Sequence, residues 1–193
     1  MSDLVVGDGY KTLQDEGELE AFAALVRQEG ISSYLEIGSK FGGSLWRVAQ
    51  EMLPESRIVT VDLPGGTKAW KESEASLKRC SEELRKAGHR VYNLWGNSQD
   101  KKIIEKVRSL GPYDLILIDG DHRMPGVTAD WKNYSGMGKR IAFHDISWRR
   151  APTWEGTRID VPEFWRSVKE GHKYEEIVMC PTGKNNGIGV LWR

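Results

Sequence analysis

Residues with side chains suited to chemistry stand at the ends of five short apolar runs in the sequence. They are Glu36 with Gly38, Asp62, the segment 96–99 (Gly-Asn-Ser-Gln), Asp119 with Asp121, and His144 with Asp145. The carboxyl ends of parallel strands meet at one edge of an open α/β sheet, and ligands bind beyond that edge. We therefore expect these residues to converge on one small-molecule site.

The first of these strand ends leads into a glycine-rich turn, Glu36 to Ser44. Gly38 and Gly42 are four residues apart, so the backbone can approach a ligand without an intervening Cβ atom. The pattern Glu-x-Gly-x-x-x-Gly differs from the Gly-x-Gly-x-x-Gly that binds a pyrophosphate. Glu36 would repel a phosphate and attract a cationic amine or sulfonium. A tight turn with glycines for geometry alone is the structural alternative.

Asp62 follows the second apolar run, with Leu63 next to it. An acidic side chain at this position typically binds the ribose hydroxyls of an adenosine-containing cofactor. A solvated turn residue is the alternative interpretation.

Three residues are candidates for catalysis: Asp121, His122 and His144. The pKa of an unperturbed histidine is about 6.5, so its imidazole can accept a proton at neutral pH. His144 leaves a buried strand directly at the expected cleft. The alternative for His122 is a helix cap or a hydrogen bond that holds a loop.

Apolar runs that alternate with longer amphipathic segments predict βα units and a largely parallel sheet. We expect strands at 34–37, 57–61, 90–95, 113–118 and 140–143, and helices at 16–29, 44–52, 67–86, 100–109, 126–134 and 161–169. Two final strands, 174–179 and 188–192, are predicted to form an antiparallel hairpin across the turn 183–187. The predicted fold is a Rossmann-like, mostly parallel seven-stranded α/β sheet with a C-terminal antiparallel hairpin and helices on both faces. We expect a single domain over 1–193, with an N-terminal helical segment at 1–30 and a lid loop at 146–160.

The basic residues suit the lid interpretation. Arg149, Arg150 and Arg158 accompany Trp148 and Trp154, and they could grip an anionic or sugar-like acceptor or form a solvated charge cluster.

Composition argues against several classes of partner. Lys and Arg total 28 and Asp and Glu total 28, so no net charge favours nucleic acid or an anionic membrane. Cys80 and Cys180 form no metal or redox motif. Neither a signal peptide nor an apolar stretch of about 20 residues is present, so we expect a cytoplasmic protein with no membrane partner. The sequence is also compatible with assembly of the protein into a homo-oligomer.

The strand ends together resemble those of class I S-adenosylmethionine-dependent methyltransferases, in particular the small O-methyltransferases related to catechol O-methyltransferase. The chain is more similar still to bacterial and phage proteins with Ile-Asp-Gly-Asp-His and Phe-His-Asp strand ends, here 118–122 and 143–145. The resemblance covers about residues 30–146.

The resemblance implies S-adenosylmethionine as the cofactor. Glu36 and Gly38 would contact its methionine part, Asp62 its ribose, and Asn97, Ser98 and Gln99 its adenine edge. Asp119 and Gly120 would lie beside the methionine end. The full set of expected cofactor residues is Glu36, Gly38, Ser39, Gly42, Ser44, Asp62, Leu63, Asn97, Ser98, Gln99, Asp119 and Gly120.

In metal-dependent relatives, the residues that match Asp119, His144 and Asp145 hold a divalent ion. The histidine departs from that pattern, because Mg²⁺ prefers oxygen ligands whereas Mn²⁺, Fe²⁺ and Zn²⁺ also accept imidazole. Either the ion differs, or His144 acts as a general base without a metal.

The leading hypothesis is methyl transfer to an oxygen of a small-molecule or glycan acceptor. One alternative is an inactive methyltransferase-like domain used for binding or assembly. Another is a nicotinamide-dependent oxidoreductase, against which the absent Gly-x-Gly-x-x-Gly pattern and Glu36 count.

Overall fold

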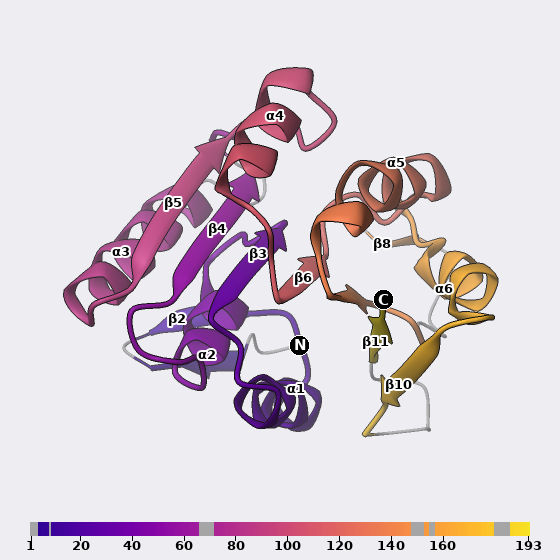
Figure 1. Cartoon of the computed structure of the whole chain (residues 1–193), viewed down its shortest axis with the longest axis horizontal. Helices are drawn as coiled ribbons and strands as arrows, with labels where there is room; N and C mark the ends of the chain where they lie inside the picture. The colour runs from indigo at the N-terminus through magenta and orange to yellow at the C-terminus, as the bar shows by residue number, and fades with distance from the viewer. Residues whose placement is uncertain (1–3, 8, 66–71, 148–152, 155–156, 180–185) are drawn as a thin grey trace.

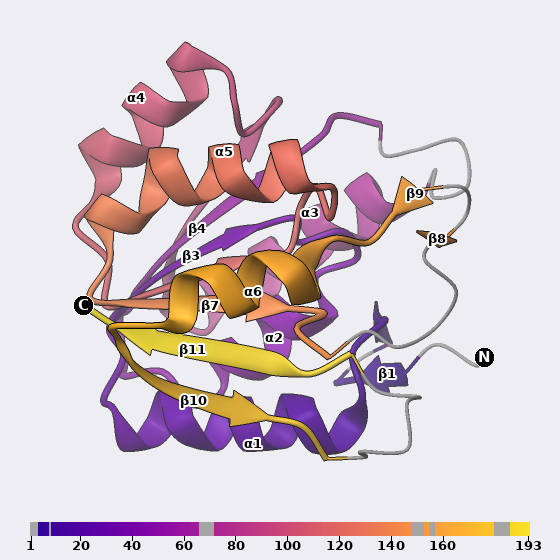
Figure 2. The ribbon, with the colours of Figure 1, turned by 90° about the vertical axis from the view of Figure 1, so that its right-hand side faces the viewer.

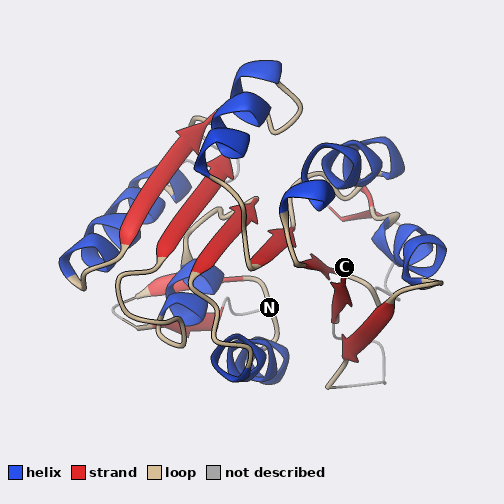
Figure 3. Ribbon diagram, viewed as in Figure 1, coloured by secondary structure: helices blue, strands red, loops and turns tan. Residues whose placement is uncertain are grey.

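A twisted seven-stranded sheet forms the centre of the protein, with helices packed on both faces (Figures 1 and 3). The structure, a computed structural model, describes residues 4–7, 9–65, 72–147, 153–154, 157–179 and 186–193. The strands lie in the order β10-β11-β7-β6-β3-β4-β5. They are β3 Ser33–Ile37, β4 Arg57–Asp62, β5 Arg90–Trp95, β6 Leu115–Ile118, β7 Arg140–His144, β10 Lys173–Ile177 and β11 Ile188–Trp192.

The predicted fold class is confirmed. The five strands β7, β6, β3, β4 and β5 are parallel, and β10 and β11 form the antiparallel hairpin. Strand β11 lies between β7 and β10, so the second strand of the hairpin is internal and the first is at the edge (Figure 2).

The sheet separates the hydrophobic core into two halves, and helices cover each half (Figures 1 and 2). α1 Glu16–Gln28, α2 Gly43–Ala49 and α3 Ser73–Lys86 cover one face; α4 Lys101–Leu110, α5 Met124–Tyr134 and α6 Val161–Lys169 cover the other. A short 3-10 helix, Ser135–Met137, follows α5. No helix among the described residues is long and apolar enough to cross a bilayer.

Strand alternation decides which face each site residue lies on. Leu117 of β6 and Ala142 of β7 pack in the half of the core that contains α1, whereas Ile118 and Phe143 pack in the other half. His144 is two residues after Ala142, so its side chain is directed to the α1 side of the sheet.

The predicted helix at 16–29 is confirmed as α1, but the strands that precede it were not predicted from the sequence. A small antiparallel hairpin, β1 Leu4–Val6 with β2 Tyr10–Thr12, precedes α1. It packs closely on α2, because a Cβ atom on Gly43 would come within 2.4 Å of the Lys11 carbonyl oxygen. Strands of three residues are too short to show a period of two in the sequence.

Two other predicted segments extend beyond the described residues. The third helix is described from Ser73 to Lys86 as α3, and the predicted start at Thr67 lies among positions 66–71, outside the described residues. Within the expected lid, β8 Thr153–Trp154 pairs with β9 Thr157–Arg158. Trp148, Arg149 and Arg150 lie outside the described residues, so the lid remains a prediction.

Candidate active site

The glycine-rich turn lies where the strand order reverses, between β3 and β6. Gly38 has a φ of 91°, and a Cβ atom there would lie 2.2 Å from the carbonyl oxygen of Asp119. Only glycine permits this approach of the two strand ends. The ends of β3 and β6, which carry Gly38 and Asp119, therefore lie together, as the sequence predicts.

Asp62 fastens the turn from the end of β4. Its Oδ2 accepts a hydrogen bond from the backbone N–H of Lys40, and its Oδ1 accepts one from that of Leu63 at 2.7 Å. Burial raises the pKa of this carboxyl, although these backbone donors oppose the shift. A carboxylate has about four lone-pair positions, so these two bonds leave acceptor capacity for a ligand.

Glu36 lies beneath the turn and is fully buried. The Ser44 hydroxyl donates to its Oε1 at 2.6 Å and the Tyr34 hydroxyl to its Oε2 at 2.8 Å. Burial raises the pKa of Glu36 to about 7 despite these donors. Glu36 therefore supports the turn from inside through Ser44, which lies in the first turn of α2.

Ser39 and Gly42 complete the turn. Gly42 has a φ of 83° and precedes α2. Ser39 is buried, and its hydroxyl has no hydrogen-bond partner among the described residues. A buried polar atom of this kind commonly marks the position of a water or ligand.

The loop after β5 is joined to α5. Asn97 accepts a hydrogen bond from the backbone of Gln99 at 2.9 Å, and the Ser98 hydroxyl donates to Oδ1 of Asp130 at 2.7 Å. The Tyr134 hydroxyl donates to the carbonyl of Ser98.

The sequence interpretation missed Asp130. This residue is fully buried, burial raises its pKa to about 6, and its Oδ2 has no partner in the part of the chain that the structure describes. The sequence does contain a sign of this role. Val127, Asp130 and Tyr134 recur at helical spacing, which places Asp130 on the face of the helix that packs in the core.

Two histidines and two aspartates form a cluster at the ends of β6 and β7. Nδ1 of His122 lies 2.6 Å from Oδ2 of Asp145, and its Nε2 lies 3.7 Å from Oδ1 of Asp119. Nδ1 of His144 lies 3.2 Å from the same Asp119 oxygen and 3.4 Å from Oδ1 of Asp145. Asp145 reaches both rings from a left-handed backbone with a φ of 65°.

The two histidines differ in their access to solvent. The His144 side chain is 3% exposed and that of His122 is 26% exposed, so His122 is the ring that a molecule in solution can reach. Burial works to lower the pKa of His144, but the charges of Asp119 and Asp145 outweigh it and raise the pKa to about 9. For His122 burial is likewise outweighed, by the hydrogen bond to Asp145, and the pKa is raised.

The structure directs Asp121 away from this cluster. Its carboxylate accepts hydrogen bonds from the Arg123 guanidinium at 2.6 and 2.9 Å and from the Arg123 backbone at 3.1 Å. These bonds lower the pKa of Asp121. They organise the start of α5, and Asp121 is not among the residues that the structure brings together at the cluster.

Three residues of the cluster could hold a metal ion. Ligand atoms of Asp119, His122 and Asp145 all lie within 4.8 Å of one another. Two of the three expected ligands belong to this group, but its imidazole is His122 and not His144. A carboxylate-imidazole set of this kind suits Mn²⁺, Fe²⁺ or Zn²⁺.

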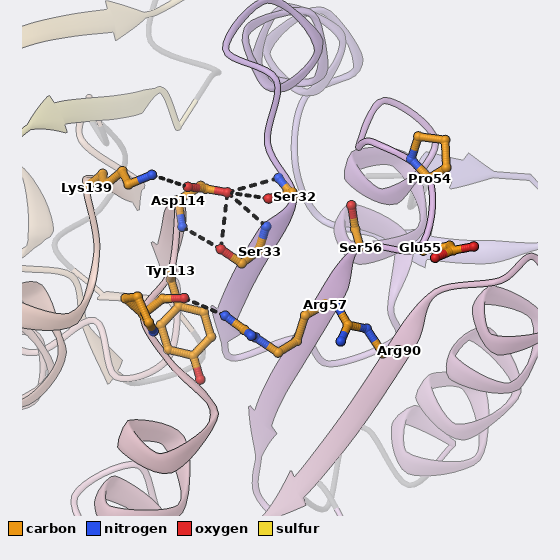
Figure 4. A pocket seen from close by; sticks show the side chains of 11 residues that line it. Ser32, Ser33, Pro54, Glu55, Ser56, Arg57, Arg90, Tyr113, Asp114 and Lys139 are labelled. Carbon is orange, nitrogen blue, oxygen red and sulfur yellow. Dashed lines mark hydrogen bonds and ion pairs between the residues drawn. The ribbon is translucent and has the colours of Figure 1, made fainter.

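A cavity of about 450 Å³ lies at the opposite edge of the sheet (Figure 4). It is formed at the amino ends of β3, β4 and β5, where Ser33, Arg57 and Arg90 begin the strands. Asp114 accepts four hydrogen bonds there from the backbones and hydroxyls of Ser32 and Ser33, and pairs with Lys139 at 2.8 Å. These contacts hold neighbouring strands together. The candidate site residues follow the carboxyl ends of the strands, so this cavity at the amino ends is separate from them.

Solved structures of low sequence identity share the fold. The O-methyltransferase from Bacillus cereus in complex with SAH is 16% identical, with a TM-score of 0.67 over 93% of this chain and 82% of its own. The O-methyltransferase TomG from Streptomyces achromogenes, in complex with SAM, is 14% identical, with a TM-score of 0.66 over 96% and 82%. Cofactor-bound Rv0187 from MTB is 16% identical, with a TM-score of 0.70 over 92% and 80%. A search of curated proteins found no match.

Comparison with protein families gives a more specific result. The model of a family described as a methyltransferase domain matches residues 35–146. This segment, more than half of the chain, runs from β3 to just beyond β7 and contains the glycine-rich turn, Asp62 and the histidine-aspartate cluster. The protein therefore belongs to this family of methyltransferase domains.

Proposed function

We propose that the protein transfers a methyl group from S-adenosylmethionine to an oxygen of a small-molecule or glycan acceptor. One observation carries the proposal: the Gly38 turn meets Asp119 at the reversal of strand order, with acidic residues on both sides. Such an acidic turn suits a sulfonium better than a pyrophosphate. SAH and SAM accompany two structures of the same fold.

The residues around the turn fit this cofactor. In the proposal, Asp62 binds the ribose through its remaining lone pairs, beside Leu63. Asn97, Ser98 and Gln99 line the adenine side, with Asp130 fixing Ser98. The methionine side is lined by Gly38, Ser39, Gly42, Asp119 and Gly120. The Ser39 hydroxyl, which has no hydrogen-bond partner in the described part of the chain, supports a ligand contact there. Glu36 and Ser44 hold the turn from below. When bound, the cofactor supplies an electrophilic methyl group.

The acceptor needs a group that removes its hydroxyl proton. We assign this role to His122, the exposed ring of the cluster, with Asp145 orienting it through the 2.6 Å contact. A His-Asp pair holds the imidazole in a defined tautomer and stabilises its charged form. His144 and Asp119 support the pair from the buried side.

The same residues allow a metal-assisted variant of the reaction. Asp119, His122 and Asp145 would then hold a divalent ion, with His144 beside them, and the ion would lower the pKa of the acceptor hydroxyl. Retention of activity in a chelator would support the His122 base, whereas loss in chelator and recovery with Mn²⁺ would support the metal.

Calorimetry with S-adenosylmethionine, SAH and NAD tests the cofactor assignment. We expect the first two to bind and NAD not to bind. Binding of NAD alone would favour an oxidoreductase, and binding of none would favour an assembly role. Labelled methyl transfer to a panel of catechols, phenols and sugars then tests the acceptor class. Cofactor binding without transfer to any member would favour the inactive binding domain.

A further inference from the structure

Asp160 is a buried acid at the N-cap position of α6. Its carbonyl oxygen accepts the first hydrogen bonds of this helix, from the backbone N–H groups of Glu163 and Phe164, both at 3.0 Å. An aspartate at this position commonly also caps its own helix, because its carboxylate accepts a hydrogen bond from a backbone N–H of the first turn. The Asp160 carboxylate makes no such capping bond to α6, and its contacts lie elsewhere.

The Asp160 carboxylate binds the start of the neighbouring helix α5, which lies beside α6 (Figures 1 and 2). Its Oδ2 accepts a hydrogen bond from the backbone N–H of Met124, the first residue of α5, at 2.9 Å. The N-cap residue of α5 is Arg123, whose side chain makes no capping bond. The first N–H groups of a helix have no partner inside it, and a negative charge beside them is favourable. Asp160 therefore caps α5 from 36 positions away in the chain.

The backbone of Asp160 binds the same loop a second time. Its N–H donates to the carbonyl oxygen of His122 at 2.8 Å. Asp160 is thus attached to the loop after β6 at two points, one on each side of Arg123. The remaining carboxylate oxygen, Oδ1, accepts a hydrogen bond from the guanidinium of Arg158 in β9. Both oxygens of the buried carboxylate are bonded, which compensates the cost of its burial.

These two attachments fix the backbone that carries the His122 ring. Nδ1 of the ring lies 2.6 Å from Oδ2 of Asp145, and the side chain is 26% exposed. The ring must therefore meet Asp145 on one side and a molecule from solution on the other. A displacement of about 1 Å in such an arrangement can lower a rate by about a hundredfold, so the position of this backbone matters for the reaction.

We propose that Asp160 is a positioning residue for His122: it fixes the loop between β6 and α5 so that the ring faces both Asp145 and the acceptor. The inference rests on the proposed function and deepens it, since it makes the start of α6 part of the site. It applies equally whether His122 takes the proton of the acceptor or binds a metal ion.

Three variants separate this role from general support of the fold. Asp160→Ser keeps a residue that caps α6 well, but its hydroxyl is shorter than the carboxylate by a bond and does not reach the Met124 amide. Asp160→Asn keeps an oxygen acceptor for that amide. Glu163→Gln is the matched control, because Glu163 is an exposed acid in the first turn of the same helix and faces Arg158 at 3.9 Å.

Nuclear magnetic resonance of ¹⁵N-labelled protein in EDTA tests the role without an acceptor or a metal. In Asp160→Ser we expect faster solvent exchange of the Met124 amide and a shift of the His122 ring signals, which His122→Gln assigns. Asp160→Asn and Glu163→Gln should keep the wild-type signals. The ring signals of His89, which precedes β5, should not move in any variant.

An unchanged His122 ring in Asp160→Ser would overturn the proposal. Asp160→Glu serves if Asp160→Ser does not fold, because its longer side chain moves the carboxylate away from its present place beside Met124. We expect it to shift the His122 ring signals as well, and unchanged signals there would have the same meaning.

Methyl transfer and SAH calorimetry on the same samples separate this inference from the proposed function. In Asp160→Ser, kcat should fall about tenfold or more while the affinity for SAH stays at the wild-type value. A wild-type kcat in this variant, with an acceptor that the wild type methylates, would overturn the positioning role. Absence of SAH binding to the wild type would refute the cofactor assignment, whereas a shift of the His122 ring signals in Asp160→Ser would still establish the link between α6 and the loop after β6.

Discussion

Nδ1 of His122 lies 2.6 Å from Oδ2 of Asp145, and this contact joins the loop after β6 to the end of β7. Two residues that are 23 positions apart in the chain thereby form one His-Asp pair.

Replacement of His122 by Gln should lower the rate of methyl transfer by about a hundredfold, because general-base catalysis typically contributes that much or more. Affinity for SAH should stay near the wild-type value. Labelled methyl transfer and calorimetry measure the two quantities. His89→Gln, at the amino end of β5, is the matched control and should keep full activity. Full activity in His122→Gln would remove His122 from the mechanism.

Asp62→Ala should weaken SAH binding at least about tenfold, since it removes the proposed ribose contacts and frees the amides of Lys40 and Leu63. Calorimetry gives the affinity. Asp100→Ala, at an exposed position before α4 where the side chain makes no capping bond, should bind as the wild type does. Unchanged affinity in Asp62→Ala would contradict the proposed register of the cofactor.

Gly38→Ala should destabilise the fold by more than about 2 kcal/mol, because a Cβ atom meets the Asp119 carbonyl and the backbone is left-handed. Urea unfolding measures the loss. Gly136→Ala is the control: its Cβ atom would have no neighbour within 4 Å, so little change is expected. An unchanged free energy of unfolding in Gly38→Ala would show that the ends of β3 and β6 are not in the close contact described.

Glu36 should make stability depend on pH in a defined direction. Its pKa rises from 4.5 to about 7 on folding, so the folded state binds more protons between these values. The protein should therefore lose stability as pH rises from about 4.5 to about 7, by on the order of 3 kcal/mol from this group. Thermal unfolding of Glu36→Gln across this range should show a flatter curve, whereas exposed Glu55→Gln should keep the wild-type curve. An equally steep curve in Glu36→Gln would assign the effect to another group.

Asp114→Ala should cost about 2 kcal/mol, since it leaves the donors of Ser32 and Ser33 without this acceptor. Burial opposes the shift, but Lys139 and Ser32 hold the pKa of Asp114 below its usual value of 3.8. Its contribution is thus present above about pH 4 and is lost as pH falls further. Denaturant unfolding at pH 7 and pH 3 tests this sign. Lys139→Ala should cost less, because the serine donors remain bound.

The parallel core could be predicted from the sequence because apolar runs of four to six residues alternate with helical patterns. The convergence of Gly38 and Asp119 followed from topology, since strand ends meet at one edge. The N-terminal hairpin could not be predicted, because three-residue strands carry no clear period.

The roles of the side chains in the histidine-aspartate cluster were harder to predict from the sequence. Asp121 and His122 are neighbours in sequence, yet Asp121 binds Arg123 and His122 binds Asp145. Asp145 also has a left-handed backbone, which the sequence does not signal. Asp130 was missed because it is a single acid inside an otherwise amphipathic helix.

The position of β11 has a consequence for the order of assembly. β11 follows β7 and β10 in the chain but lies between them, so β10 has no neighbour in the sheet until β11 has been synthesised. Ile188, which pairs with His144, and Gly187, which binds Glu18, arrive with it. A growing chain can form the strands around the glycine-rich turn well before this point. The histidine end of the sheet is thus completed only when β11 is added beside β7, after the parallel strands have been synthesised.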